Sequence, residues 1–122
     1  MIKIMFYCIN FFFLSFLPNY QHSDTIMGIW KATDLNNSTI ELYETEAGLL
    51  HGKIIDSDEK AWIGKVILTE GKYDSKNNQW QGNLYSLKRK MTIPATLSLT
   101  SKNKLKLVGK KFLMTKTFYW ER

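Results

Sequence analysis

The sequence of 122 residues predicts an all-β protein, an eight-stranded antiparallel up-and-down barrel preceded by an N-terminal signal peptide. Three observations predict this fold class. Apolar residues alternate with polar ones over most of the chain, turn-forming clusters separate the alternating runs, and no window of a dozen residues has an amphipathic helical pattern. A flat sheet of such strands would expose an apolar face and two edges. Closure into a barrel is therefore expected, with a two-sheet sandwich as the alternative.

The N-terminal segment has the features of a secretory leader. Residues 4–17 are apolar or aromatic except for Asn10 and Ser15, one Lys precedes them, and Pro18 ends the run. This run is shorter than the roughly 20 residues needed to span a bilayer. We therefore assign residues 1–23 to a signal peptide and expect a protein that is periplasmic, outer-membrane-associated or secreted. A buried N-terminal helix or strand is one alternative, and an uncleaved anchor is another because no small-x-small cleavage site is evident.

Removing the leader leaves a domain of residues 24–122 that contains no cysteine. The only cysteine, Cys8, lies inside the apolar run and not at its end, which makes it a poor lipid acceptor. A single cysteine excludes a disulfide scaffold and a cysteine-based zinc site. The exported domain must be stabilised by core burial alone, and a domain of this size buries only about two thirds of its unfolded-chain surface.

The first half of the domain is expected to hold four strands, at residues 28–33, 38–45, 49–56 and 65–73. In the first three strands one face is formed in chain order by Gly28 and Trp30, by Ile40 and Leu42, and by Leu50, Gly52 and Ile54. Turn residues at 34–38 and 46–48 separate these strands. Residues 57–64 predict a short helical turn that carries Trp62.

The second half is expected to hold four more strands, at residues 79–86, 89–99, 104–110 and 114–121. The apolar positions are, in chain order, Trp80, Gly82 and Leu84; the odd positions from Met91 to Leu99; Leu105, Leu107 and Gly109; and Phe118 and Trp120. Turn clusters at 74–78 and 101–104 separate them. Pro94 lacks an N–H, so we expect it at a bulge or on a locally unpaired side of its strand.

Several short motifs follow one another along the predicted strands. They are Gly28-x-Trp30, Glu41-Leu42-Tyr43, Gly52-Lys53-Ile54, Trp80-Gln81-Gly82-Asn83-Leu84-Tyr85, Leu105-Lys106-Leu107-Val108-Gly109 and Trp120-x-Arg122. The first and last resemble the barrel-closure motif of lipocalins and related calycins. The whole set resembles the bacterial exported family catalogued as domain-of-unknown-function family 2147, whose fold is lipocalin-like. The resemblance implies that Gly28, Trp30 and Arg122 close the barrel, with the guanidinium stacked on the indole for about 0.5–2 kcal/mol.

Two segments depart from that family. The loop between the third and fourth strands is usually longer and rich in Asn, Pro and Arg, and here it covers only about residues 56–64. The Pro/Gly turn and the Tyr that usually follow the Trp-x-Gly-x-x-Tyr strand are replaced by Ser86-Leu87-Lys88-Arg89-Lys90. The functions of those loops in longer relatives are therefore not carried over to this chain.

Five large side chains are candidates for lining a ligand site: Trp62, Trp80, Tyr85, Met91 and Phe118. The interior of a small eight-stranded barrel is either filled by side chains or holds one small ligand. Because interior area is scarce in a short domain, a packed core is favoured over an open cavity. The leading functional hypothesis is nonetheless a monomeric, non-enzymatic, lipocalin-like protein that binds a small apolar or amphipathic ligand in the barrel mouth.

Acidic and basic residues are unevenly distributed along the domain. Residues 24–75 contain ten acidic and five basic side chains, whereas residues 76–122 contain eleven basic and one acidic. The candidates for an anionic-surface patch are Lys88, Arg89, Lys90, Lys104, Lys106, Lys110 and Lys111. Export, and the lack of stacking aromatics among the lysines, argue against nucleic acid. The patch is interpreted either as a solubilising face or as a surface that attracts anionic lipid, envelope polysaccharide or the acidic half of another copy.

Residues suited to catalysis or metal binding are few. His22 lies beside the leader junction, and His51 lies alone on the polar face of its strand. Asp56, Asp58 and Glu59 form the densest acidic group, for which solvated loop charges are favoured over a weak cation site. The chain has no Gly-x-Ser-x-Gly, P-loop or dinucleotide fingerprint. We therefore predict no enzymatic activity, no cofactor and no metal.

Overall fold

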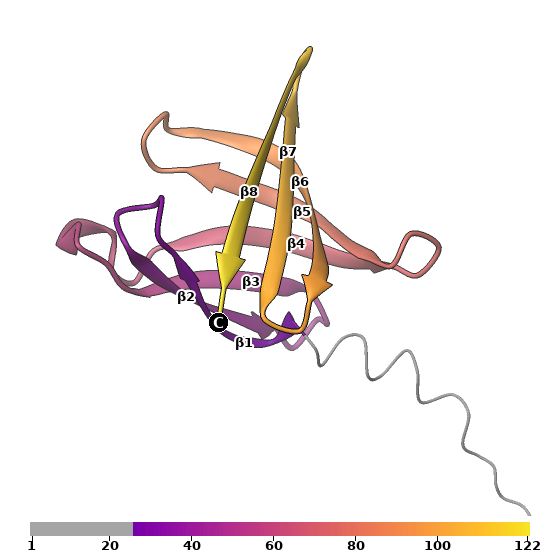
Figure 1. Cartoon of the computed structure of the whole chain (residues 1–122), viewed down its shortest axis with the longest axis horizontal. Helices are drawn as coiled ribbons and strands as arrows, with labels where there is room; N and C mark the ends of the chain where they lie inside the picture. The colour runs from indigo at the N-terminus through magenta and orange to yellow at the C-terminus, as the bar shows by residue number, and fades with distance from the viewer. Residues whose placement is uncertain (1–25) are drawn as a thin grey trace, which may run out of the picture.

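The computed structural model describes residues 26–122 and shows a closed barrel of eight antiparallel strands in chain order (Figure 1). The strands are β1 (Gly28–Ala32), β2 (Ser38–Glu44), β3 (Leu50–Asp56), β4 (Val66–Asp74), β5 (Gln79–Ser86), β6 (Met91–Ser101), β7 (Lys104–Lys111) and β8 (Met114–Glu121). The all-β barrel is confirmed, every strand end lies within two residues of the predicted one, and the sandwich alternative is excluded. The predicted helical turn is the 3-10 helix η2 (Lys60–Trp62). The assignment of residues 1–23, with Cys8 and His22, lies outside the described residues.

Antiparallel order divides the connections between two ends of the barrel. The closed end holds the start of β1, the β2–β3, β4–β5 and β6–β7 turns, and the C-terminus. The open end holds the β1–β2 turn, the β3–β4 connection with η2, the β5–β6 turn and the β7–β8 turn.

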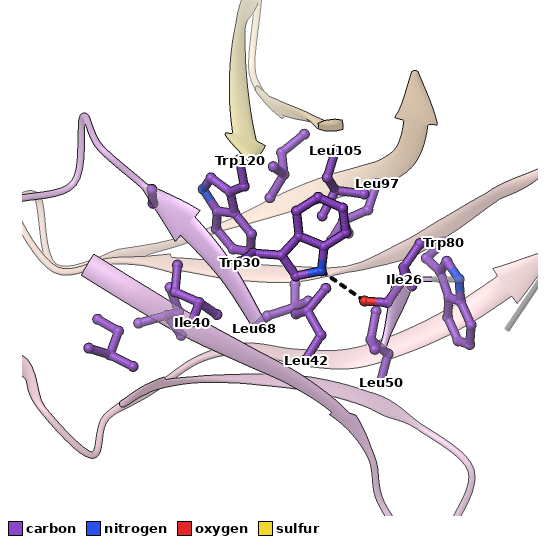
Figure 2. Packing of buried hydrophobic residues seen from close by; sticks show 14 residues of the cluster. Ile26, Trp30, Ile40, Leu42, Leu50, Leu68, Trp80, Leu97, Leu105 and Trp120 are labelled. Atoms are coloured by element: carbon purple, nitrogen blue, oxygen red, sulfur yellow. Dashed lines mark hydrogen bonds between the residues drawn. The ribbon is translucent and has the colours of Figure 1, made fainter. Parts of the chain in front are cut away.

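The closed end is filled by apolar side chains. The fully or almost fully buried residues of this core include Trp30, Ile40, Leu42, Leu50, Leu68, Trp80, Leu97, Leu105 and Trp120 (Figure 2). Gly52 allows the strands to approach here, because a Cβ at this position would lie 2.9 Å from Leu42 Cδ2 and 3.2 Å from Leu68 Cβ. The alternating residues that the sequence placed on one face of each strand therefore make one continuous core.

Strand pairing is incomplete toward the open end. Within the described residues, β1 and β8 pair only through Lys31 and Glu121, because β1 is short. Pairing between β6 and β7 begins at Ala95, so Pro94 is paired with Asn83 of β5 but lies outside the β7 ladder. This is the locally unpaired side expected for a proline. The β7–β8 hairpin consequently projects away from the rest of the barrel (Figure 1).

Candidate functional site

A cavity of about 520 Å³ lies at the open end of the barrel. Its lining comes from the β1–β2 turn and from β4 to β8: Asp34, Leu35, Ile67, Leu84, Tyr85, Ser86, Lys88, Arg89, Met91, Ile93, Leu107, Gly109, Lys111, Phe112, Met114, Lys116, Thr117, Phe118 and Trp120. It lies where the β6–β7 ladder ends and where β8 has left β1. The interior is therefore hollow beside the β5–β6 and β7–β8 hairpins. The expected packed core fills the closed end and also reaches the open end beside β1 to β3, where Ala32, Ile40 and Ile54 are fully buried.

The floor of the cavity is apolar. Ile67, Leu107 and Trp120 are buried at its base, and these same side chains form the upper surface of the core. Ile93 and Phe118 are half-buried and complete the walls from β6 and β8. Leu107, Ile93, Phe118 and Trp120 occupy inward positions of their strands, so the alternation that fills the closed end also gives the open end an apolar lining. Ile67 joins the lining where the β3–β4 pairing shifts register, beside buried Leu68.

The rim of the cavity is basic. Lys88 and Arg89 extend from the β5–β6 turn, and Lys111 and Lys116 from the β7–β8 hairpin. Within residues 26–122 the salt bridges join other groups, so none of these four cations is neutralised by a carboxylate. Asp34 is the one acidic residue in the lining. An anionic group at the mouth would thus meet several uncompensated positive charges.

The five predicted ligand residues are not brought together. Tyr85, Met91 and Phe118 line the cavity. Trp80 is buried in the closed-end core with its ring centroid 5.4 Å from that of Tyr73. Trp62 packs against the core from η2 and is not part of the lining.

The other apolar lining residues were not singled out from the sequence. They are Leu35, Ile67, Leu84, Ile93, Leu107 and Trp120, together with residues of the β7–β8 hairpin. The sequence does indicate that some of them point inward, since Leu84 follows the polar Asn83, and Ile93 alternates with Thr92. Alternation alone does not distinguish a residue that lines a cavity from one that packs in a core.

The barrel-closure residues meet at the closed end. The Arg122 guanidinium carbon lies 4.2 Å from the centroid of the Trp30 ring. The Trp30 indole N–H donates to the Ile26 carbonyl at 2.9 Å, as Figure 2 shows. Arg122 Nε also donates to the Lys102 carbonyl at 3.1 Å. Gly28 begins β1 with φ at +122°, a conformation that favours glycine. These contacts join the first strand, the β6–β7 turn and the C-terminus.

The predicted basic patch is divided by the fold. Lys104 and Lys106 lie in the half of β7 nearer the closed end, where Lys104 Nζ is 3.7 Å from Glu121 Oε2. The remaining members, Lys88, Arg89, Lys90, Lys110 and Lys111, belong to the two hairpins that flank the cavity. The positive charge that concerns the cavity is therefore only part of the patch.

The other titratable groups form no recognisable catalytic or metal centre. His51 lies against Tyr43, with 5.9 Å between ring centroids. Within residues 26–122 no group of three or more His, Cys, Asp or Glu side chains is arranged to hold a metal ion. Hydrogen bonding from Asn77 lowers the pKa of Asp74. In the described part of the chain, no helix is both long and apolar enough to cross a membrane.

Comparisons with known proteins give no relative from which a function can be carried over. No family model matches the chain. No curated protein and no solved structure shows significant similarity to it.

Proposed function

We propose that this protein is a lipocalin-like binding protein that holds one small amphipathic molecule, with an apolar tail and an anionic head, at the open end of its barrel. The main observation in favour of this proposal is the cavity of about 520 Å³, with an apolar floor and a basic rim. Its volume lies in the range of about 300–1,000 Å³ that is usual for small-molecule sites. An apolar tail would displace water from the floor, while the anionic head would stay at the mouth beside Lys88, Arg89, Lys111 and Lys116.

Binding without turnover is the proposed role. The cavity lining contains neither His nor Cys, and its hydroxyl groups have no adjacent imidazole to act as a base. Apolar burial contributes about 0.8 kcal/mol for each methylene removed from water. The rim charges discriminate between head groups, since a neutral head gains no ionic attraction from them.

Calorimetric titration with decanoate, decyl phosphate and decanol tests this proposal. The two anionic ligands are expected to bind at least about tenfold more tightly than the alcohol, and added salt should narrow the difference. Equal affinities for all three ligands would show that the basic rim does not contribute to binding. Failure of all three to bind would remove the ligand-binding proposal.

A pair of variants on one strand supplies a matched control. Ile93→Trp places a bulky side chain in the cavity and should abolish decanoate binding. Thr92→Trp adds the same side chain at the neighbouring exposed position of β6, outside the cavity lining, and should bind decanoate like the wild type. If both variants bind alike, the ligand lies elsewhere.

A second candidate function is adsorption to an anionic envelope surface. It is favoured by the cluster of basic residues on two neighbouring hairpins, none of them in a salt bridge within residues 26–122. Adsorption to anionic vesicles or polysaccharide should weaken strongly with salt. Adsorption that is equal at low and high salt would contradict it.

We also propose that the chain is exported and that it is kin to the lipocalin-like family it resembles. The leader pattern and the order of the strand motifs support this. N-terminal sequencing of protein recovered from cells should find a start between residues 18 and 24. A retained leader would instead support the uncleaved anchor.

A further inference from the structure

The tip of the β7–β8 hairpin exposes three consecutive large apolar side chains. Phe112, Leu113 and Met114 are 95%, 101% and 67% exposed, and within residues 26–122 no other large hydrophobic residue is as exposed as these three. They lie at the far end of the hairpin that projects from the barrel (Figure 1). An isolated apolar residue on a surface is ordinary, but three consecutive ones at a protruding tip mark an interaction site.

The backbone of the tip gives independent support. Phe112 and Leu113 form a two-residue turn between the paired residues Lys111 and Met114. Phe112 has φ at +57°, in the left-handed region that turns normally reserve for Gly, Asn or Asp. A bulky aromatic residue is unfavourable there, and its exposed ring gains no burial in return. Folding of the domain thus does not account for a phenylalanine at this position.

Basic residues surround the apolar tip. Lys110, Lys111 and Lys116 flank it on the hairpin. The Lys111 ammonium lies 5.9 Å from the centroid of the Phe112 ring. The β5–β6 turn, which shares the cavity with the hairpin, adds Lys88, Arg89 and Lys90. Apolar side chains at a tip with ammonium groups behind them match the depth profile of a membrane interface, where acyl chains lie beneath anionic phosphates.

We propose that the β7–β8 tip inserts Phe112, Leu113 and Met114 into an anionic lipid bilayer while the surrounding basic residues contact the headgroup phosphates. The contact between basic residues and phosphates rests on the second candidate function, adsorption to an anionic surface. The insertion of the apolar tip goes beyond that function. The mouth of the cavity would then face the lipid surface, from which an amphipathic ligand could enter.

The distribution of acidic residues sets the orientation. Asp34 lies in the β1–β2 turn, Asp56 ends β3, and Asp58 and Glu59 lie in the β3–β4 connection, on the other side of the open end. Of these four, Asp56 has a cation nearby, since Lys60 Nζ lies 4.0 Å from Asp56 Oδ1. An anionic surface repels that side and attracts the two basic hairpins, so the barrel would meet the bilayer tilted, with the β7–β8 tip foremost. A narrow two-residue tip also offers a protein partner little of the roughly 800 Å² per side that a stable protein interface needs.

Vesicle binding by the full chain tests the charge step. Lys90→Glu with Lys110→Glu removes charge from the two hairpins at positions outside the cavity lining. The matched control, Lys76→Glu with Lys102→Glu, makes the same change in two turns of the closed end. Affinity for phosphatidylcholine vesicles that contain phosphatidylglycerol should fall at least about tenfold for the first pair and much less for the second. Equal losses would overturn the proposed orientation.

A fluorescent label at the tip tests insertion separately, because the N-terminal apolar segment could also bind vesicles. In a Cys8→Ser background, an environment-sensitive dye on Leu113→Cys should brighten and shift to the blue with these vesicles. The same dye on Lys102→Cys, at the closed end, should not change. A dye at residue 113 that stays water-exposed while the protein still adsorbs would overturn insertion and leave the second candidate function standing.

The double variant Phe112→Asn with Leu113→Ser completes the test. It places turn-favouring residues at the tip, so its melting temperature should equal or exceed that of the wild type while its vesicle affinity falls about tenfold or more. If the variant instead keeps its vesicle affinity and only its oligomeric state in solution changes, the tip is an interface between two copies of this chain and the membrane proposal fails. Ile93→Trp should bind vesicles normally, which separates this inference from the ligand proposal.

Discussion

The two ends of this barrel are built from the same alternating strands but differ in how the strands finish. At the closed end, Trp30 is joined to the C-terminus by Arg122, whose guanidinium carbon is 4.2 Å from the indole centroid. At the open end β8 has no partner on the β1 side beyond the single pair Lys31 and Glu121, within the described residues. The Arg122 contact therefore ties the C-terminus to β1 at the closed end, whereas the β5–β6 and β7–β8 hairpins at the open end border a hollow, charged cavity.

Two turns, one at each end, also differ, although the β1–β2 turn of the open end likewise has asparagines, Asn36 and Asn37, in the left-handed region. At the closed end, the turn between β4 and β5 places Asn78 in the left-handed region, which asparagine tolerates well, and the Asp74 carboxylate accepts hydrogen bonds from Lys76 N and Asn77 Nδ2. At the open end, the turn between β7 and β8 places Phe112 in the same region. The β4–β5 turn has residues that favour its backbone conformation. The β7–β8 turn has a phenylalanine that does not.

The largest expected effect concerns the closed end. Trp30→Ala removes a side chain that is 1% exposed, together with its hydrogen bond to Ile26 and the stacking of Arg122. The free energy of unfolding should fall by about 3–5 kcal/mol, as measured by chemical denaturation. A loss below about 1 kcal/mol would mean that the closed end does not carry the stability of the barrel.

Substitutions at two glycines allow the packing around the core and around the cavity to be compared directly. A Cβ on Gly71 would lie 2.6 Å from Leu50 Cβ, whereas one on Gly109, at the cavity, would lie 3.3 Å from the movable Ile93 Cγ2. Gly71→Ala should therefore cost about 1–3 kcal/mol. Gly109→Ala should stay within about 1 kcal/mol of the wild type, since a less flexible unfolded chain offsets the small displacement. Equal losses in thermal denaturation would show that the open half is as tightly packed as the closed one.

Most of the fold could be predicted from the sequence, because burial of one face fixes the period of a strand and turn residues fix its ends. Pro94 was expected to disrupt pairing, and the β6–β7 ladder begins just after it. The cavity was harder to foresee. Trp80 and Phe118 both occupy inward positions, yet one packs in the core and the other lines the cavity. Which outcome occurs depends on where neighbouring strands separate, and that is a long-range property.

The exposed tip was missed because an alternating pattern assigns apolar residues to an interior. Strand periodicity shows the segment Lys110-Lys111-Phe112-Leu113-Met114 only as the junction of two strands. A signal was present in it, since this hairpin turn lacks the Gly, Asn or Asp found at most turns of the chain. Apolar residues in a turn between lysines are expected to be exposed, but strand periodicity does not predict the exposure of turn residues.

A smaller effect is expected at that tip. Phe112→Gly relieves the unfavourable backbone conformation and removes a ring that is almost fully exposed. The free energy of unfolding should stay unchanged or rise by up to about 1 kcal/mol, measured by thermal denaturation without lipid. A clear loss of stability would show that the ring packs against the barrel in solution, and the contrast between the two turns would disappear.

The smallest expected effect concerns the turn at the closed end. Asn77 Nδ2 donates to Asp74 Oδ2 at 2.8 Å, and this bond is the main cause of the lowered pKa of Asp74. Asn77→Ala should therefore raise the pKa of Asp74 toward its ordinary value, which an NMR titration of the carboxyl carbon would measure.

The sign of the accompanying stability change follows from linkage. A carboxyl whose pKa is lowered in the folded state contributes stability above its unfolded pKa, and this contribution disappears as the pH falls through the folded value. Wild type and Asn77→Ala should therefore differ slightly at neutral pH and converge once Asp74 is protonated in both. Because this carboxylate is exposed, solvent screening keeps the difference small. A difference that persisted in acid would mean that Asn77 stabilises the turn through its backbone conformation, without the charge on Asp74.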